Sequence, residues 1–438
     1  MTLRRLDARA LGAEGVARAL DRAPERVASE IHQAVGEILA AVRERGDAAL
    51  IELTTRFDRV ALTPARLAVA SAEYDEAESR VGEPTLAALR YAAARIEAFH
   101  RAAMPKAWSM TDACGSRLGQ EVRPLERVGI YVPGGRAAYP STVLMTAVPA
   151  RVAGVREIVL VSPPAADGTL NPAVLAAARI AGVTEAYRVG GAQAVAALAY
   201  GTESIRRVDK IVGPGNIYVA LAKSRVFGDV GIDMLAGPSE VVVIADGEAD
   251  AAYVAADLLA QAEHDPMARS VLLSPSSTLL DAVEQETARQ LAALPRREIA
   301  ASALRDNGAL VLTSSLAEAV DVANRLAPEH LELSVAEPDA LLARVRCAGA
   351  VFLGRHTPEV VGDYVAGPNH VLPTGGTARF ASALSTEDFV RRLSVIQYSP
   401  RGLAEAWPHL AELARVEGLQ AHSEAARVRI ASNGGGAA

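Results

Sequence analysis

The sequence predicts an α/β fold built from two open parallel sheets, each an incomplete Rossmann-like domain, with small helical appendages at both ends. Half of the 438 residues are hydrophobic but only 4% are aromatic, a composition typical of Ala-, Val- and Leu-rich helices packed on parallel sheets. Short β-branched runs also alternate with helix-length segments, which indicates successive βαβ units. Because 438 residues exceed one hydrophobic core, we expect more than one domain.

The N-terminal part is predicted to be helical. Between residues 24 and 45, five apolar side chains recur at helical spacing: Val27, Ile31, Val35, Ile38 and Val42. Gly46 follows and is placed to end this helix. A second helix is expected over about residues 83 to 101.

Strand-like runs begin after Arg127 and fall into two series, each run being followed by a helix-length segment. The first series is GIYVP, REIVLVS, EAYRVG and DKIVG, and the second is EVVVIAD, RSVLLS, GALVLTS and AGAVFLG. The change of series near residues 237–240 predicts two separate sheets. Beyond about Ser385 the pattern predicts helices again, over TEDFVRRLSVIQY and LAEAWPHLAELARVEG.

The charge balance favours small-molecule partners. Forty-five basic and 52 acidic side chains leave a net charge of −7, which repels nucleic acid and anionic membranes. Cys114 and Cys347 are too few for a disulfide framework, and neither belongs to a CxxC pair. The N-terminus lacks an apolar leader, and no apolar run approaches the ~20 residues that span a bilayer. We therefore expect a soluble cytoplasmic protein that binds neither nucleic acid nor membrane.

Two glycine turns in the first series suit a dinucleotide. In RVGGAQAVAALAYG a strand runs through Gly190 and Gly191 straight into a helix, so free N–H groups and the helix dipole face any ligand there. In KIVGPGNIYV, Asn216 stands at a helix N-cap, where its amide meets either a ligand or the helix. Tyr131 ends a strand and either stacks on a planar ring or packs in the core. Ordinary turns stay an open alternative, because no GxGxxG or GxxxxGK[ST] motif occurs.

A metal site is the interpretation of a second group of residues. Gln261 and His264 share a helical face in LLAQAEHD. With Asp363, from a Gly- and Pro-rich loop, and His422, near the C-terminus, they form a nitrogen and oxygen donor set that zinc accepts. Spacing supports only the first pair, so surface, capping and turn-forming roles stay open.

Glu329 and His330 in APEHLEL are the candidate bases. Because neighbouring side chains project in different directions, the two would do separate jobs. A buried Glu can activate water, and a His can move a proton to or from an alcohol oxygen, which suits a two-step reaction. A capped helix start after Pro328 is the alternative interpretation.

Eight motifs, in this order, resemble the histidinol dehydrogenase family over nearly the whole chain: ERVGIYVPGG, VGGAQAVAALAYGT, VGPGNIYV, IDMLAGPSEV, LLAQAEHD, LAPEHLEL, GDYVAGPNHVLPT and EGLQAHSEAARVR. The resemblance implies zinc-dependent four-electron oxidation of L-histidinol to L-histidine through L-histidinaldehyde. It also implies that two NAD are reduced per substrate, in the last steps of histidine biosynthesis.

The resemblance further implies roles for named residues. Glu329 would activate water, and His330 would remove protons. One zinc ion per subunit would be held by Gln261, His264, Asp363 and His422. Those four residues would also contact the substrate, together with His330, Ser239 and Glu417. NAD would be contacted by Tyr131, Gln193 and Asn216.

The resemblance also implies a homodimer in which the C-terminal segment completes the partner's active site. We expect four segments: an N-terminal appendage at 1–23, a larger α/β domain at 24–130 plus 241–384, an NAD-binding Rossmann-like domain at 131–240 and a C-terminal helical appendage at 385–438. The larger domain would carry the zinc and catalytic residues.

Three other functions would use some of the same residues. A related enzyme that oxidises another primary alcohol, such as a sulfonated diol, would use the same zinc and NAD machinery, and Glu417 and His422 argue for histidinol. A zinc hydrolase lacks support, because neither HExxH nor HxxEH occurs. A non-catalytic nucleotide-binding module would need only the glycine turns.

Overall fold

The structure is a computed structural model that describes residues 3–20, 28–134 and 139–433. Within those ranges, no helix has both the length and the apolar character needed to cross a membrane. The contacts divide the chain into two compact units, one formed by Met1–Ala103 with Leu125–Phe389 and the other by Met104–Pro124 with Val390–Ala438. The first unit contains two parallel sheets, which confirms the predicted α/β class.

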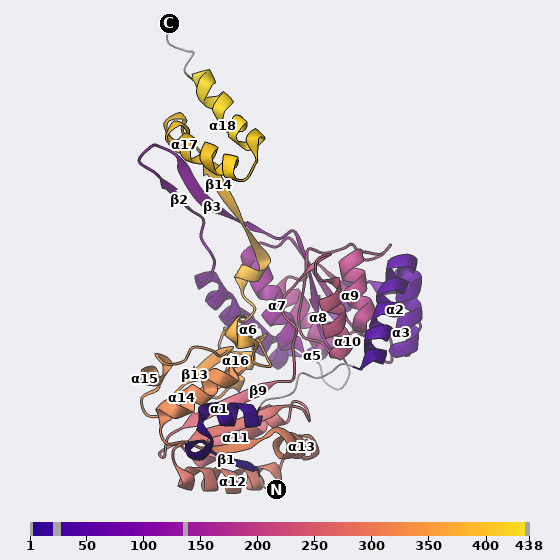
Figure 1. Ribbon diagram of the computed structural model, residues 1–438. Helices are drawn as coiled ribbons and strands as arrows, with labels where there is room; N and C mark the ends of the chain where they lie inside the picture. The colour runs from indigo at the N-terminus through magenta and orange to yellow at the C-terminus, as the bar shows by residue number, and fades with distance from the viewer. Residues whose placement is uncertain (1–2, 21–27, 135–138, 434–438) are drawn as a thin grey trace. The chain divides into compact units, whose positions relative to one another are not determined.

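A six-stranded parallel sheet organises one half of the first unit. Its strands, in spatial order, are β1 (Arg4–Asp7), β11 (Ala309–Leu312), β10 (Arg269–Ser274), β9 (Glu240–Ala245), β12 (His330–Ser334) and β13 (Ala350–Leu353). The second predicted series of strands is therefore confirmed. β1, drawn in indigo, brings the N-terminal segment into a sheet otherwise built from the middle of the chain (Figure 1).

Helices cover both faces of this sheet, because successive strand residues point to opposite sides. Val241 and Val243 of β9 face one hydrophobic cluster, and Val242 and Ile244 face the other. The first face is covered by α11 (Ala251–Ala262), α12 (Ser277–Leu291) and α13 (Arg297–Asn307). The second face is covered by α1 (Ala8–Leu20), α14 (Leu316–Leu326) and α15 (Pro338–Leu342).

A five-stranded parallel sheet organises the other half. Its strands, in spatial order, are β6 (Glu185–Arg188), β5 (Glu157–Ser162), β4 (Arg127–Tyr131), β7 (Lys210–Val212) and β8 (Gly231–Ile232). Numbered along the chain, the strands lie in the order 3-2-1-4-5, and β9 to β13 repeat that order in the six-stranded sheet. The order reverses between β4 and β7 and again between β9 and β12, and such reversals are where open α/β sheets bind ligands.

Helices also pack on both sides of the five-stranded sheet. The crossover helices are α7 (Pro140–Ala153), α8 (Pro172–Ala181), α9 (Gly191–Tyr200) and α10 (Ile217–Val226). The N-terminal helices that pack outside them are α2 (Ser29–Arg45), α3 (Asp47–Phe57), α5 (Ser71–Val81) and α6 (Glu83–Ala102), and the short α4 (Pro64–Leu67) lies near β6. Figure 1 shows α2 and α3 beside α9 and α10. The two predicted N-terminal helices and the stop at Gly46 are confirmed, and Val27 lies outside the described residues.

The predicted domain boundaries stay a prediction. Some helices and strands pack with other parts of the chain than those boundaries imply. β1 and α1, expected in a separate N-terminal appendage, pack on the six-stranded sheet. α2 and α3, expected in the larger domain with residues 241–384, instead share a core with the five-stranded sheet.

The second unit corrects the prediction of helix over TEDFVRRLSVIQY. Only its first residues are helical, as the 3-10 turn η2 (Thr386–Phe389), and the rest is a strand. This strand belongs to an antiparallel sheet with the order β14 (Val390–Gln397), β3 (Arg117–Pro124) and β2 (Trp108–Thr111). Because β14 pairs along its whole length with a segment far away in sequence, no local pattern could reveal it.

Helices complete the list of elements. In the second unit, β14 is followed by α17 (Pro400–Val416) and α18 (Gln420–Asn433). The C-terminal segment is therefore α-helical only after residue 399. In the first unit, the loop after β13 carries α16 (Val360–Tyr364) and the 3-10 turn η1 (Thr377–Arg379).

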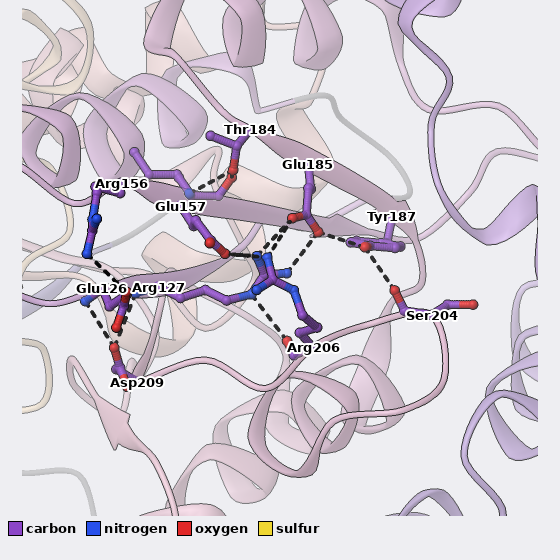
Figure 2. Close-up of polar contacts among 11 residues, drawn as sticks. Glu126, Arg127, Arg156, Glu157, Thr184, Glu185, Tyr187, Ser204, Arg206 and Asp209 are labelled. Carbon is purple, nitrogen blue, oxygen red and sulfur yellow. Dashed lines mark hydrogen bonds and ion pairs between the residues drawn. The ribbon is translucent and has the colours of Figure 1, made fainter.

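A buried arginine ties three strands together at the amino edge of the five-stranded sheet (Figure 2). Arg127 begins β4, is 5% exposed, and binds Glu185 of β6 through two hydrogen bonds of 2.8 Å. It also pairs with Glu157 of β5. Arg206 approaches the same two carboxylates, at 2.6 Å from Glu157 and 3.5 Å from Glu185. The hydrogen bonds from Arg127 lower the pKa of Glu185 to about 2.

This network predicts loss of stability in acid. The depressed pKa of Glu185 means that the pair stabilises the fold above the ordinary carboxyl pKa and loses that contribution as pH falls from about 4 to about 2. Arg127→Met removes the buried cation and leaves only Arg206 near the two carboxylates, so we expect a loss of roughly 3 kcal/mol at pH 7. Urea unfolding at pH 7 and pH 3 measures the free energy of unfolding. The difference in that free energy between the wild type and Glu185→Gln should be smaller at pH 3 than at pH 7.

A second pH effect is expected from His100, on α6. Its side chain is 1% exposed, and neither ring nitrogen has a hydrogen-bond partner among the described residues. Burial lowers the His100 pKa to about 4. The folded state therefore resists protonation, and its stability falls as pH drops below the ordinary histidine pKa of about 6.5.

His100→Leu should remove this dependence. Between pH 7.5 and pH 5, urea unfolding of the wild type should lose about 2 kcal/mol that the variant keeps. Equal slopes of unfolding free energy against pH in the two proteins would contradict the assignment.

Candidate functional site

Three predicted site residues meet at the amino edge of the six-stranded sheet. Glu329 and His330 stand at the start of β12, and Ser239 stands immediately before β9. The two strands are neighbours, with His330 opposite Val241. The Glu240 N–H donates to Glu329 Oε2 at 2.9 Å, which holds the carboxylate against β9. Parallel pairing thus joins two motifs far apart in sequence.

The turn that delivers Glu329 to this edge is strained. α14 ends at Ala327, whose φ of 47° lies in the left-handed region that residues with a Cβ rarely adopt. Pro328 follows, and then Glu329. The alternative of a helix starting after Pro328 is wrong, because these residues lead into a strand.

Glu329 is a carboxyl group held in a low-polarity environment. Its side chain is buried, and burial raises its pKa well above the usual range. The Glu240 N–H bond opposes that shift, while the negative charges of Glu240 and Asp363 add to it. A carboxyl group whose pKa is raised in this way suits proton transfer near neutral pH.

His330 is a neutral imidazole with one free acceptor. It is 4% exposed, and burial lowers its pKa to about 4. Nδ1 lies 3.2 Å from the carbonyl oxygen of Glu240. Because a carbonyl only accepts hydrogen bonds, Nδ1 carries the proton, and Nε2 is left to accept one from another group. The Phe352 ring, 5.9 Å away between centroids, packs against the imidazole.

Next to His330 lies a group of donors able to hold a metal ion. Ligand atoms of His330, Glu359 and Asp363 all lie within 4.8 Å of one another. Both carboxylate oxygens of Glu359 are buried and lack a hydrogen-bond partner in the part of the chain that the structure describes. Asp363 belongs to the predicted metal set, and Glu359 does not.

Gln261 gives the clearest sign that a ligand belongs here. The side chain is fully buried, yet neither amide atom has a hydrogen-bond partner among the described residues. Leaving such a group unpaired costs about 1–3 kcal/mol, so a ligand that engages the amide offsets a real penalty. Oxygen and nitrogen donors without thiolate match zinc. The residues present therefore fit the predicted metal.

Two histidines stand beside this group. His264 is exposed and follows Gln261 at the end of α11. His370 donates from Nδ1 to the Asp363 carbonyl oxygen at 3.0 Å, so Nε2 is the acceptor nitrogen of its neutral ring. Burial lowers the His370 pKa, and Asp363 and His264 influence it in opposite directions. His264 also lowers the pKa of His330, so the charges of these histidines lie within range of one another.

Glu332 connects the two segments that carry the predicted ligands. It points from β12 to the same side as His330 and accepts the Glu359 N–H at 2.8 Å. It also shares a side-chain hydrogen bond with Asp257, one helical turn before Gln261 on α11. Burial raises the pKa of Asp257 to about 6 and that of Glu332 well above its ordinary value. The two carboxyl groups can therefore share a proton.

Sequence reasoning missed Glu332, Glu359 and His370. The only signal for His370 was that histidine is scarce, with eight in the chain. Nothing in the sequence indicated that the two carboxyl groups would be buried.

The predicted NAD residues lie at the carboxyl edge of the five-stranded sheet. Tyr131 ends β4, is buried, and its hydroxyl accepts a hydrogen bond from the Gly191 N–H at 3.0 Å. Burial raises the Tyr131 pKa to about 12. Gln193 is buried in the first turn of α9. Asn216 caps α10, accepting from the N–H groups of Tyr218 and Val219 at 3.1 and 3.2 Å.

Of the open alternatives, Tyr131 thus packs in the core and Asn216 caps its helix. Their contacts with NAD stay a prediction.

Glu417 and His422 belong to the second unit. Glu417 follows α17 and precedes Gly418, whose φ is 71°. His422 lies in the first turn of α18. Both side chains are exposed, and their part in the site stays a prediction.

Comparisons with known proteins agree on one family. The sequence model of the histidinol dehydrogenase family matches residues 21–430. Histidinol dehydrogenase from Geobacillus kaustophilus is 56% identical over 411 residues, covering 94% of this chain and 96% of that protein. The enzyme of the same name from Rhizobium meliloti is 55% identical over 404 residues, covering 92% and 93%.

A solved structure supports the same assignment. The crystal structure of histidinol dehydrogenase from Elizabethkingia anophelis matches with a TM-score of 0.94 and 36% sequence identity, and the match covers 99% of each chain. Both sequence and fold are therefore shared over nearly the full length, which confirms the resemblance seen in the motifs. The chain belongs to the histidinol dehydrogenase family.

Proposed function

We propose that this oxidoreductase carries out a zinc-dependent four-electron oxidation of L-histidinol to L-histidine through L-histidinaldehyde, with reduction of two NAD. The reaction would form the last steps of histidine biosynthesis, in the cytoplasm. Family membership supports the substrate. The observation that carries the chemistry is the buried pair of Glu329 and His330, together with the buried amide of Gln261, which has no hydrogen-bond partner among the described residues. Asp257 joins the Gln261 helix to the strand of His330 through its hydrogen bond with Glu332.

His330 supplies the base for both oxidations. Nε2 of the neutral imidazole accepts the hydroxyl proton of the alcohol, and the carbinol hydrogen leaves as a hydride, giving the aldehyde. NAD, when bound, accepts that hydride. After Nε2 has released the first proton to solvent, the same base takes a hydroxyl proton from the hydrated aldehyde, and a second hydride leaves to a second NAD, giving the carboxylate. Phe352 and the Glu240 carbonyl keep the ring in one orientation throughout.

Glu329 supplies the base for the step between the two oxidations. Addition of water to the aldehyde carbon requires a group that accepts the water proton, and a buried carboxylate does this well because its pKa lies above the usual range. The Glu240 N–H bond orients the carboxylate. The two bases thus use separate protons, although Glu329 Oε2 lies 3.6 Å from His330 Nδ1 and the two side chains do not diverge as the sequence spacing predicted.

Gln261, His264, Asp363 and His422 are the proposed zinc ligands. Bound zinc would position the substrate and act as a Lewis acid, without redox chemistry of its own. A substrate with imidazole and amine nitrogens can itself chelate the ion, which would place the carbinol beside His330. Ser239 and Glu417 are the proposed additional substrate contacts.

NAD is proposed to lie at the carboxyl edge of the five-stranded sheet, contacted by Tyr131, Gln193 and Asn216. The change of strand order between β4 and β7 supports this location.

The proposed homodimer has its support in the second unit. This unit exposes apolar side chains on its sheet and on its helices, including Trp108, Met110, Ile396, Leu413 and Val416. Ile396 is 71% exposed and Val416 is 69% exposed. Clusters of exposed apolar side chains mark interfaces. We propose that Glu417 and His422 complete the partner's site.

The stoichiometry of NADH is the first test. Purified enzyme should form two NADH per L-histidinol, lose activity on chelation and regain it with zinc. Glu329→Gln should shift the product toward the aldehyde, with a ratio near one, because addition of water loses its base. His330→Asn should slow both oxidations by roughly 10²–10⁴-fold.

A matched control is His356→Asn. His356 is an exposed histidine just after β13, at the opposite edge of the same sheet, so its loss should leave rate and ratio unchanged. A wild-type ratio near one would overturn the four-electron assignment.

Mixed dimers test whether sites are shared between subunits. His330→Asn and His422→Asn should each be nearly inactive alone. If His422 serves the partner's site, half of the randomly mixed dimers carry one intact site, so co-expression should restore about a quarter of wild-type activity. No recovery in isolated mixed dimers would place His422 in the site of its own chain.

A further inference from the structure

We propose that the buried ion pair between Lys223 and Asp233 positions the turn that receives NAD. The inference rests on the proposed function, because it assumes that the carboxyl edge of the five-stranded sheet is the NAD site. Neither residue belongs to the predicted site residues, although Asp233 lies within the motif IDMLAGPSEV. Both would act through the backbone of Gly213 and not by touching the reacting atoms.

The pair holds both polar groups of one glycine. Lys223 Nζ donates to the Gly213 carbonyl oxygen at 2.9 Å and pairs with Asp233 Oδ1. Asp233 Oδ2 accepts the Gly213 N–H at 2.7 Å. The side chains of Lys223 and Asp233 are only 3% and 1% exposed. One charge pair, closed off from solvent, therefore determines the orientation of the peptide groups on both sides of Gly213.

The geometry of Gly213 leaves little freedom. Its φ of 111° favours glycine, and a Cβ there would lie 2.3 Å from the Tyr131 carbonyl oxygen. The backbone after β7 is thus pressed against the end of β4, where the strand order reverses. The next residues, Pro214 and Gly215, are partly exposed and lead to the exposed Asn216 at the start of α10. The fixed backbone of Gly213 therefore determines the position of the turn formed by residues 213–216.

Stability alone is a weak reason for such a pair. Replacing a buried ion pair by apolar groups is often neutral or stabilising, because desolvation offsets the attraction. At this position the pair holds the backbone in one defined geometry. A ligand that binds N–H groups along the turn then binds more tightly, because those groups need not be ordered on binding. Loss of the pair should weaken NAD binding without changing how histidinol binds.

Arg127 offers a matched control. It also forms a buried ion pair in the five-stranded sheet, but at the amino edge, away from the turn (Figure 2). Arg127→Met should destabilise the protein as much as Lys223→Met does. Lys223→Met removes a hydrogen bond to Gly213, and Arg127→Met does not.

The experiment measures NADH binding apart from turnover. Full-length wild type, Lys223→Met and Arg127→Met would be titrated with NADH by fluorescence in the absence of histidinol, and KM for NAD and for histidinol would be measured separately. We expect the NADH dissociation constant of Lys223→Met to rise about tenfold, with KM for NAD rising in parallel and KM for histidinol within about twofold. Arg127→Met should bind NADH like the wild type.

Each other outcome has a defined meaning. Unchanged NADH affinity in Lys223→Met would overturn the inference, as would equal weakening in Arg127→Met, which would trace the effect to general destabilisation. If Lys223→Met does not fold, Lys223→Met with Asp233→Asn removes both charges together and should show the same selective loss. A wild-type enzyme that fails to bind NADH would instead overturn the proposed function.

Discussion

The pairing of β9 with β12 is the constraint on which the candidate site depends. Their parallel register brings Ser239 and Glu240 against Glu329 and His330, so that Glu240 orients both bases through its own N–H and carbonyl groups. A slip of one residue would turn His330 to the other face of the sheet and break both bonds. The tautomer of His330 and the orientation of the Glu329 carboxylate follow from this one contact, whereas burial raises the pKa of Glu329.

The two parallel sheets share a strand order, but their predicted site residues lie at opposite edges. The predicted NAD residues stand at the carboxyl edge of the five-stranded sheet, where open α/β sheets usually bind ligands. The predicted catalytic residues stand at the amino edge of the six-stranded sheet. Its carboxyl edge is occupied by protein groups, because Asp246 accepts the Ala336 N–H at 2.7 Å and pairs with Arg355 at 3.0 Å.

Much of the architecture was predictable because it depends on local signals. Buried parallel strands such as β9 and β10 are continuous apolar runs, and α2 has its own helical period and ends at a glycine. β14 was not predictable, since it is a strand only through its long-range partner β3. Glu332 and Glu359 were missed for a related reason, because burial of a carboxyl group depends on neighbours contributed by other elements.

The sequence by itself determined the fold class, the family and the residue types available for chemistry, because hydrophobic periodicity and ordered motifs are properties of short segments. Only the tertiary structure decided which of these residues work together. It brought Glu329, His330 and Asp363 within range of one another and placed a charge pair around Gly213. It also buried the amide of Gln261 with no hydrogen-bond partner among the residues that the structure describes. The physical reason is that pKa values, tautomers and unpaired polar atoms depend on burial and distance, which arise only when separate segments pack.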